Sequence, residues 1–320
     1  MKKILIIGSG AMGAAFSIPC LDNKHSVTLC EPYNHQLIKN IISNKNFHPA
    51  LKLQLPQRLI IKTFSKEILN EKWDLIVIAV SSIGMDWVRE NLKELKFKSQ
   101  ILILTKGLKF NKKTKKIVTM SEQLNEGNKK YNISVLKGPC LAKELARKIK
   151  SSTIIANKNI KIAQSIGKLI STKYYKTEFS RDVRGVEICS AIKNIYSMLI
   201  GAGEGANTAS TIFTQSILEM VYLTKIFKGK EETVYGLAGI GDLYVSAVGG
   251  RNSKMGQYLG KGYNFKNAKK KFMLNDTVEG AELVFEIGNY ILKKIDNKKI
   301  PLMVDLLKAI LGNKKLIIRW

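Results

Sequence analysis

The chain has 320 residues, of which 45% are hydrophobic and 24% charged, a composition typical of a globular protein that excludes global disorder. Its length predicts about two domains, and no apolar stretch is long enough to span a bilayer. The formal net charge of +28 comes mostly from lysines spread along the whole chain. We therefore interpret this charge as solvated surface and expect no nucleic-acid partner.

The amino terminus, MKKILIIGSG, has two lysines before an apolar segment, as a secretory signal peptide would. We reject this interpretation because its glycines have the spacing of a ligand-binding turn. No cysteines form a CxxC pair, and the three histidines are scattered. We therefore expect no disulfide framework, no metal site and a cytoplasmic location.

Short runs rich in Ile, Val and Leu alternate with longer amphipathic stretches in the first part of the chain. These runs lack strict alternation of polar and apolar residues, which is typical of strands buried on both faces of a parallel sheet. The pattern predicts a doubly wound α/β fold of the Rossmann type. The predicted strands span residues 4–8, 26–31, 74–80, 100–105, 133–138 and 152–157.

Helical patterns separated by glycine-rich breaks dominate the rest of the chain. They cover residues 185–200, 208–228, 279–294 and 301–311. We therefore predict a dinucleotide-binding Rossmann domain over residues 1–180 and an all-helical substrate and catalytic domain over residues 181–320.

Gly8, Gly10 and Gly13 form a GxGxxG motif between the first predicted strand and a helix, the context in which the motif binds a dinucleotide. The glycines allow a tight turn, close approach of a pyrophosphate and tight helix–strand packing. Glu31 ends the second predicted strand, where a carboxylate accepts from ribose hydroxyls and repels a 2′-phosphate. It could instead be an ordinary strand-terminal acid beside Lys24. We expect NAD as cofactor, with NADP also possible.

Two other predicted strands end in polar and glycine residues, in Thr105-Lys106-Gly107 and Lys137-Gly138-Pro139-Cys140. Ligands of open α/β sheets bind at the carboxyl ends of strands. Lys106 could be a surface lysine, but its position at a strand end favours a role in ligand binding.

The helix predicted over residues 185–200 contains one unexpected charge, Lys193, among side chains that are apolar around most of the helix. Asp242 lies between glycine-rich and apolar segments, where an unpaired carboxylate would be costly. We predict that the two form an ion pair, although Asp242 alone could equally be a cap or turn residue. Arg251 and Asn252 follow two glycines and could bind a phosphate, because arginine donates two parallel hydrogen bonds to such a group.

Together these motifs resemble the NAD(P)-dependent glycerol-3-phosphate dehydrogenases over essentially the whole chain. Several motifs occur in the order found in that family. They are the glycine fingerprint at 8–13, TKG at 105–107, GPxxAKELA at 138–146, GVE…AIKN at 185–194, Asn207 with LEM at 218–220, GLAGIGDL at 236–243, GGRN at 249–252 and VEG at 278–280.

The resemblance implies that Lys193 is the catalytic acid/base, with Asp242 orienting it and Lys106 assisting. A half-buried setting would lower the pKa of the lysine and an ionised Asp242 would raise it. The implied substrate is a small phosphorylated molecule, dihydroxyacetone phosphate or glycerol 3-phosphate, and the enzyme could be a homodimer. The resemblance assigns substrate contacts to Lys106, Gly138, Cys140, Lys193, Asn194, Asp242, Gly250, Arg251 and Asn252. It assigns cofactor contacts to Gly8, Gly10, Ala11, Met12, Gly13, Glu31, Lys106, Ala142, Arg251, Thr277 and Glu279.

Three residues depart from the family pattern. Cys140 stands where Ser or Thr is usual, Gln215 where Arg is usual, and Ala209 where Lys or Arg is usual. Two alternatives therefore stay open: a related dehydrogenase acting on another phosphorylated or carboxylated ketone, and a homologue that binds the cofactor but has weakened catalysis.

Overall fold

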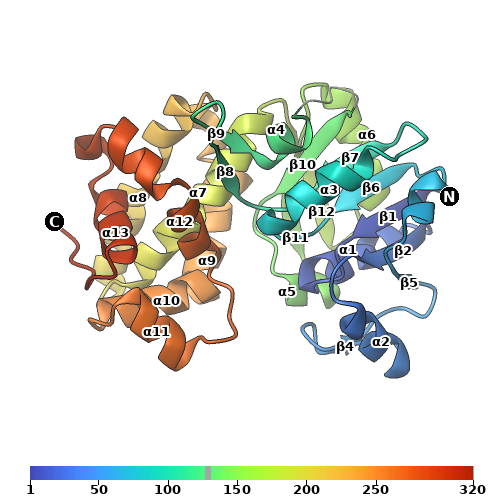
Figure 1. Ribbon diagram of the computed structural model, residues 1–320, viewed down its shortest axis with the longest axis horizontal. Helices are drawn as coiled ribbons and strands as arrows, with labels where there is room; N and C mark the ends of the chain where they lie inside the picture. The colour runs from blue at the N-terminus through green and yellow to red at the C-terminus, as the bar shows by residue number, and fades with distance from the viewer. Residues whose placement is uncertain (127–130, 320) are drawn as a thin grey trace. The chain divides into compact units, whose positions relative to one another are not determined.

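The computed structural model describes residues 1–126 and 131–319, which form two compact units (Figure 1). The first unit comprises residues 1–106 and 120–183, and the second comprises residues 107–119 and 184–320. The chain therefore passes between the units three times, after Lys106, Thr119 and Val183.

An eight-stranded sheet forms the centre of the first unit, in the order β12-β11-β10-β7-β6-β1-β2-β5. All neighbouring strands are parallel except β10 and β11, which are antiparallel. The six predicted strands are confirmed, whereas β5 and β12 were not predicted. The strands are β1 (Lys3–Ile7), β2 (Ser26–Glu31), β5 (Ile60–Thr63), β6 (Leu75–Ile78), β7 (Gln100–Ile103), β10 (Ile133–Lys137), β11 (Ser151–Ala156) and β12 (Tyr175–Ser180).

The direction in which strands are added to the sheet reverses between β1 and β6. From β1 the chain first builds β2 and β5 on one side, and then β6, β7 and β10 on the other. Doubly wound sheets bind their ligands at such a switch point, outside the carboxyl ends of the strands. The glycine motif directly follows β1 and therefore lies at this point.

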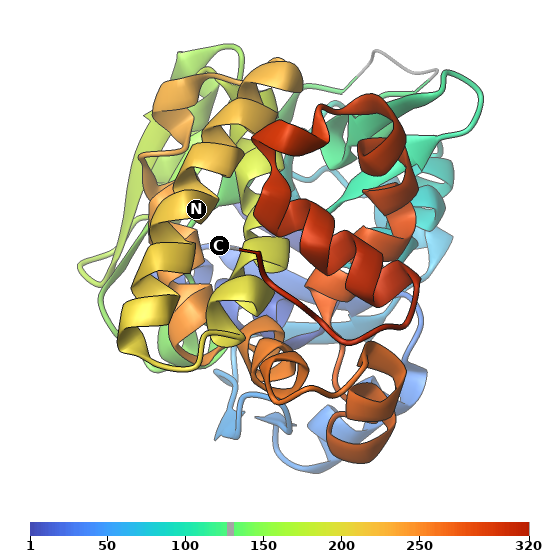
Figure 2. The ribbon, with the colours of Figure 1, turned by 90° about the vertical axis from the view of Figure 1, so that its left-hand side faces the viewer.

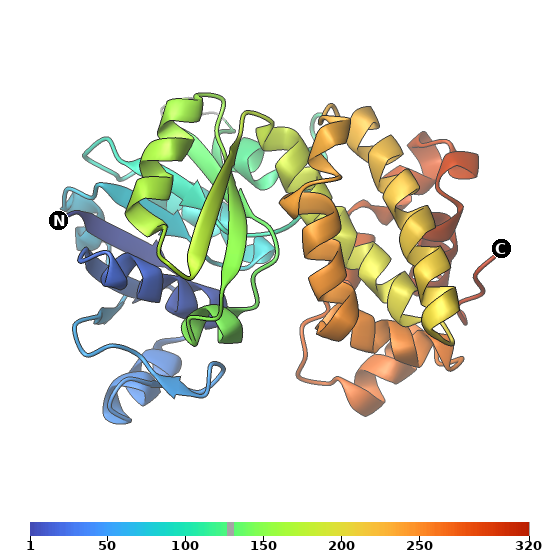
Figure 3. The same ribbon diagram turned by 180° about the vertical axis from the view of Figure 1, so that it is seen from behind.

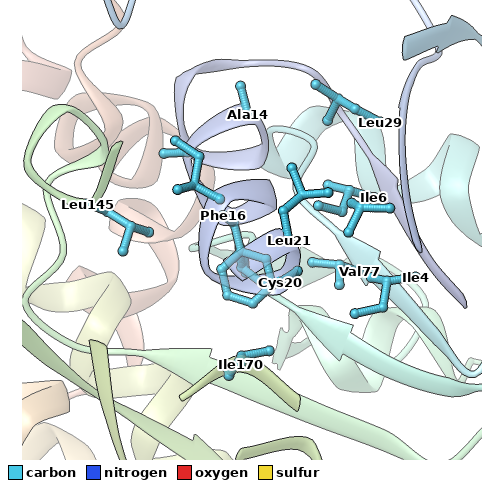
Figure 4. Packing of buried hydrophobic residues seen from close by; sticks show 14 of the residues in the cluster. Ile4, Ile6, Ala14, Phe16, Cys20, Leu21, Leu29, Val77, Leu145 and Ile170 are labelled. Atoms are coloured by element: carbon cyan, nitrogen blue, oxygen red, sulfur yellow. The ribbon is translucent and has the colours of Figure 1, made fainter. Parts of the chain in front are cut away.

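The core of this unit packs helix α1 (Ala11–Asp22) against the sheet. Phe16 and Cys20 of α1 lie near Ile4 and Val77 of the strands, as Figure 4 shows, and all four are fully buried. The remaining helices of the unit are α2 (His35–Ser43), α3 (Met85–Leu92), α4 (Met120–Leu124), α5 (Ala142–Ala146) and α6 (Ile160–Ile170), with α6 lying against β11 and β12 (Figure 3). A short hairpin joins β3 (Phe47–His48) to β4 (Leu53–Gln54).

The regular structure of the second unit, over its described residues 107–119 and 184–319, is helical apart from one hairpin. Its central helix, α7, is buried at every position from 185 to 200, and α12 and α13 pack side by side (Figure 2). The four helices predicted here are confirmed, whereas α9, α10 and α11 were not predicted. The helices are α7 (Val183–Gly201), α8 (Ala206–Ile226), α9 (Asp242–Gly249), α10 (Arg251–Gly260), α11 (Phe265–Phe272), α12 (Glu279–Lys294) and α13 (Pro301–Leu311).

The hairpin of the second unit consists of β8 (Leu108–Asn111) and β9 (Lys116–Thr119). It comes from the middle of the first unit's sequence and packs against α12. The backbone N–H of Phe110 donates to Glu286 Oε1 at 2.9 Å, and the Phe110 ring lies 5.6 Å from that of Tyr290. The pattern of residues in the sequence did not predict this hairpin.

Over the described ranges, no helix has both the length and the apolarity needed to cross a bilayer. No cluster of three potential ligands among His, Cys, Asp and Glu was found in the same ranges.

Candidate functional site

The glycine motif forms a turn that only glycine can build at two positions. Gly8 has a φ of +110°, and a Cβ added there would lie 2.7 Å from the carbonyl carbon of Ala79 at the end of β6. A Cβ on Gly13 would lie 1.9 Å from the carbonyl oxygen of Gly8. Close packing therefore requires both glycines, while Gly10 has open space around its Cβ position.

Helix α1 begins directly after this turn, with Gly10 as its N-cap and no side chain capping it. The N–H groups of its first turn and the positive end of the helix dipole suit an anionic group such as a pyrophosphate. Ala11 and Met12 of α1 pack against the same core as Cys140 and Ala142. These four residues, which are predicted to contact ligands, therefore pack on one core cluster, and the helices α1 and α5 are in contact.

Glu31 ties the glycine turn to the end of β2. Its Oε2 accepts hydrogen bonds from the Ser9 N–H at 2.8 Å and the Ser9 hydroxyl at 2.6 Å. Its Oε1 accepts from the N–H groups of Tyr33 and Asn34 at 3.0 and 3.1 Å. Burial raises the pKa of Glu31, but these hydrogen bonds outweigh burial and hold the pKa below its usual value. The carboxylate therefore has a structural role that sequence analysis missed, and the predicted ribose contact stays a prediction.

Lys137 is a buried cation next to the strand ends of the predicted site. Lys137 is the last residue of β10 and is only 2% exposed. Its Nζ donates to the carbonyl oxygens of Ile103, Leu104 and Thr105 at 3.3, 3.2 and 2.5 Å. These carbonyls directly precede Lys106, which is half-buried, so Lys137 fixes the backbone from which Lys106 extends. No role was predicted for Lys137 itself, although a lysine at the end of an apolar strand is an unusual residue that could have indicated one.

Lys193 lies in the second unit, where the structure explains a lysine within an apolar helix. Its side chain comes from α7 and the residue is 4% exposed. Its Nζ forms an ion pair with Asp242 Oδ1 at 2.8 Å, which confirms the predicted pairing. The same Nζ donates to the hydroxyl of Ser246. Asp242 and Ser246 are themselves nearly buried, at 2% and 8% exposed.

Ser246 was missed by sequence analysis, although its spacing could have identified it. Asp242 opens α9, and Ser246 follows four residues later on the same face of this helix. An amine held between a carboxylate and a hydroxyl has a fixed position, which proton transfer to or from a substrate oxygen requires.

Asn194, the residue after Lys193, is linked to Asn252 and to the start of α12. The Asn252 amide nitrogen donates to Asn194 Oδ1 at 3.0 Å, and Asn252 Oδ1 accepts from the Gly280 N–H at 2.9 Å. A Cβ on Gly280 would lie 2.5 Å from the Asn194 carbonyl oxygen, so glycine is needed for this close approach. The side chain of Asn252 is thus committed to holding two helices together. Its predicted contact with substrate stays a prediction.

Arg251 begins α10 after Gly250, which is the N-cap of that helix. Its guanidinium pairs with Glu279 Oε1 at 2.8 Å, and both side chains are about half exposed to solvent. An exposed ion pair of this kind is weak, so an anionic ligand could compete for the guanidinium.

Thr277, two residues before Glu279, is exposed. It lines a cavity of about 230 Å³ together with Lys269 and neighbouring residues of α11 and α12.

Gln215, one of the departures from the family pattern, lies on α8 and hydrogen-bonds to the buried Glu219. Glu219 also accepts from Tyr196 of α7 and from the N–H groups of Leu302 and Met303 in the first turn of α13. Burial raises the pKa of Glu219 despite these hydrogen bonds. Gln215 therefore belongs to a network that joins three helices.

Comparison with known proteins gives two family matches that together cover most of the chain. Residues 3–163 match the N-terminal part of NAD-dependent glycerol-3-phosphate dehydrogenase, and residues 182–317 match its C-terminal part. A glycerol-3-phosphate dehydrogenase [NAD(P)+] from Bacillus pumilus is 30% identical, over 98% of this chain and 92% of its own length.

Two further relatives extend this result. An NADP(+)-dependent glycerol-3-phosphate dehydrogenase from Archaeoglobus fulgidus is 28% identical, over 84% of this chain and 83% of its own length. The crystal structure of glycerol-3-phosphate dehydrogenase from Coxiella burnetii has the same fold, with a TM-score of 0.86 and 24% identity, over 98% of this chain and 96% of its own. The glycine turn and the buried amine thus occur in a chain that belongs to the NAD-dependent glycerol-3-phosphate dehydrogenase family.

Proposed function

We propose that the protein reduces dihydroxyacetone phosphate to sn-glycerol 3-phosphate with Lys193 as the acid/base. The observation that carries the proposal is the buried ammonium of Lys193, held by Asp242 and Ser246. Membership of the family supports the choice of substrate.

Lys193 supplies the proton in this reaction. In the direction of reduction, its Nζ gives a proton to the oxygen on C2 of the ketone as C2 accepts a hydride, so that the carbonyl becomes an alcohol. In the reverse direction the neutral amine takes the hydroxyl proton. Asp242 and Ser246 hold the nitrogen in one position in both directions, and the Asp242 carboxylate stabilises the charged form.

Arg251 is the proposed partner of the substrate phosphate. Its guanidinium is accessible and can donate two parallel hydrogen bonds to phosphate oxygens. In binding the phosphate it would exchange or share its contact with Glu279. The Asn252 side chain is bonded to Asn194 and to the Gly280 N–H, and so links the helices that carry Lys193, Arg251 and Glu279.

The cofactor is proposed to bind at the glycine turn, with its pyrophosphate at the first turn of α1. When bound, the reduced nicotinamide supplies the hydride. Gly10 lets the backbone approach the anion, and no Cβ blocks the space beside it. Lys106, Gly138, Cys140 and Ala142 follow the neighbouring strand ends and are proposed to bind the rest of the ligands. With Glu31 at the end of β2, we propose a preference for NAD over NADP, although relatives in the family are named for either.

The test is an assay of cofactor oxidation by the purified protein. NADH and NADPH are each supplied with dihydroxyacetone phosphate, with a panel of 2-keto acids, or with no ketone. Faster oxidation with the ketose phosphate, and more efficient use of NADH than NADPH, are the expected results.

Other results would contradict the proposal in distinguishable ways. Turnover of a keto acid but not of the phosphate would indicate a dehydrogenase for another ketone. Cofactor binding without turnover of any ketone would indicate a homologue that has lost catalysis.

The resemblance also implies a homodimer and a cytoplasmic location, and both are part of the proposal. Size-exclusion chromatography with light scattering tests the first, and fractionation of the source cells tests the second. A monomeric mass, or recovery with the membranes or in the medium, would contradict them.

A further inference from the structure

The further inference concerns His48, a buried histidine that the mechanism above does not use. His48 is 1% exposed and lies in β3, in the segment after α2. Its Nε2 lies 2.9 Å from the carbonyl oxygen of Ser9, the residue between Gly8 and Gly10. The backbone N–H of Leu51 donates to its Nδ1 at 3.3 Å.

These two contacts determine the protonation state of the ring. A carbonyl oxygen can only accept, so Nε2 must carry a hydrogen, and Nδ1 must be unprotonated because it accepts from Leu51. The contacts therefore require a neutral imidazole. Burial lowers the pKa of His48 despite the hydrogen bond to Ser9, which is consistent with a neutral ring.

His48 completes the set of hydrogen bonds that hold Ser9. The N–H and the hydroxyl of Ser9 donate to Glu31, and its carbonyl oxygen accepts from His48. All three polar groups of Ser9 are therefore engaged, by side chains that come from two different segments.

Fixing the Ser9 carbonyl also fixes the next N–H. In a trans peptide the C=O and the following N–H point in opposite directions, so the Gly10 N–H points away from His48. Within residues 1–126 and 131–319, this N–H donates none of the hydrogen bonds found. It is therefore available to an anion at the start of α1.

We propose that His48 is a positioning residue for cofactor binding, which orients the Ser9–Gly10 peptide toward the pyrophosphate only while its ring is neutral. The proposal rests on cofactor binding at the glycine turn, as proposed above. Protonation of Nδ1 would place an N–H against the N–H of Leu51 and bury a charge, which would loosen the contact with Ser9.

The other ionisable groups around His48 differ from it, because each either stays charged where histidine titrates or is exposed to solvent. Glu31 is bonded to the same serine, and its lowered pKa keeps it charged where histidine titrates. His35 and Lys39 on α2, and Lys45 and Lys52 in the flanking loops, are all exposed.

The experiment measures NAD+ affinity by calorimetry from about pH 8 to about pH 5, the range in which histidine titrates. His48→Gln keeps an N–H donor at the position of Nε2 but cannot titrate, and His48→Leu removes the donor. The matched controls are His35→Gln and His25→Gln, which remove the two other histidines of the same unit.

We expect His48→Leu to bind NAD+ about tenfold more weakly at about pH 8, the effect of one hydrogen bond of about 1.4 kcal/mol. His48→Gln should bind within about twofold of the wild type there. The wild type and both controls should lose affinity as the pH falls, and His48→Gln should lose less.

Superimposable pH profiles of the wild type and His48→Gln would overturn the proposal, as would unchanged affinity in a folded His48→Leu. If His48→Leu does not fold, the pH profile of His48→Gln still tests the proposal on its own. Since the readout is binding alone, failure of turnover with dihydroxyacetone phosphate would contradict the proposed function and leave this result unaffected.

Discussion

Asp242 and Ser246 lie one helical turn apart on α9, and an oxygen of each contacts the Nζ of Lys193. The carboxylate compensates the charge of the buried amine, and the hydroxyl gives it a second fixed contact. The two contacts differ in kind, so their removal should have different effects.

Lys193→Ala should lower kcat by about 10²- to 10⁴-fold, the usual contribution of a general acid/base. Its affinity for NADH should change little, because the glycine turn is unaltered. Steady-state assays with dihydroxyacetone phosphate and a separate NADH titration measure the two quantities. Lys266→Ala, which removes an exposed lysine on α11, serves as the control. A near-normal kcat of Lys193→Ala would show that Lys193 is not the acid/base.

Asp242→Asn should destabilise the second unit, because it leaves a buried ammonium without its counterion. Loss of one partner of a buried ion pair costs about 3–5 kcal/mol. Chemical denaturation followed by circular dichroism measures this cost. If the variant unfolds at the same denaturant concentration as the wild type, the ion pair does not support the fold.

Ser246→Ala should instead lower kcat more than stability, since the ion pair remains. We expect a loss of about tenfold in kcat, equivalent to one hydrogen bond. Ser197→Ala is the matched control because this buried serine is on α7, four residues after Lys193, and donates to the backbone. Equal effects of the two variants on kcat would argue against a role for Ser246 in holding the amine.

Asn252→Leu should destabilise the second unit and raise the KM for the ketose phosphate. It removes the hydrogen bonds to Asn194 and Gly280, and buried groups left without partners cost about 1–3 kcal/mol. Denaturation and steady-state kinetics measure the two effects. Asn267→Leu, an exposed asparagine on α11, should leave both unchanged. A wild-type denaturation curve for Asn252→Leu would show that these bonds contribute nothing.

Glu31→Gln should remove a pH dependence of stability. The pKa of Glu31 in the folded protein lies below its value in the unfolded chain, about 4.3. Its contribution is therefore present above about pH 4.3 and is lost as the pH falls through the folded-state pKa. Thermal unfolding should separate wild type and variant at about pH 7, and the difference should shrink below about pH 4. Glu178→Gln, an exposed residue of β12, is the control, and a constant difference at all pH values would contradict the prediction.

Lys137→Met should destabilise the first unit by about 1–3 kcal/mol, because it leaves carbonyl oxygens at the end of β7 without their donor. Lys176→Met, on the exposed side of β12, should have almost no effect. Denaturation of both variants provides the comparison. Equal stabilities would mean that solvent replaces the ammonium at these carbonyls.

The sequence predicted those parts of the fold that depend on continuous apolar runs. Strands β1, β2, β6, β7, β10 and β11 each bury one such run. The reversed direction of β11 was not predictable, because direction depends on how the chain returns to the sheet and not on composition. Strand β12 was missed because its sequence, YKTEFS, is mostly polar and lies at the edge of the sheet.

The candidate site was predictable where the sequence buries a charged residue, because a buried charge without a partner is costly. A lysine in an apolar helix and an aspartate among glycines each require an opposite charge, and the two meet. Ser246, His48 and Lys137 were not predicted, because serine, histidine and lysine also occur at many ordinary positions. Their roles depend on contacts between segments distant in the sequence, which only the fold specifies.

The hairpin of residues 108–119 has a consequence for how the protein must be made. Phe110 contacts Glu286 and Tyr290 of α12, yet that helix begins at Glu279, 160 positions after Thr119 ends the hairpin. During synthesis the hairpin therefore leaves the ribosome long before its partner exists. A truncated chain that ends after the sheet of the first unit would lack α12. The hairpin would then have no partner, and the Phe110 ring would be left in water.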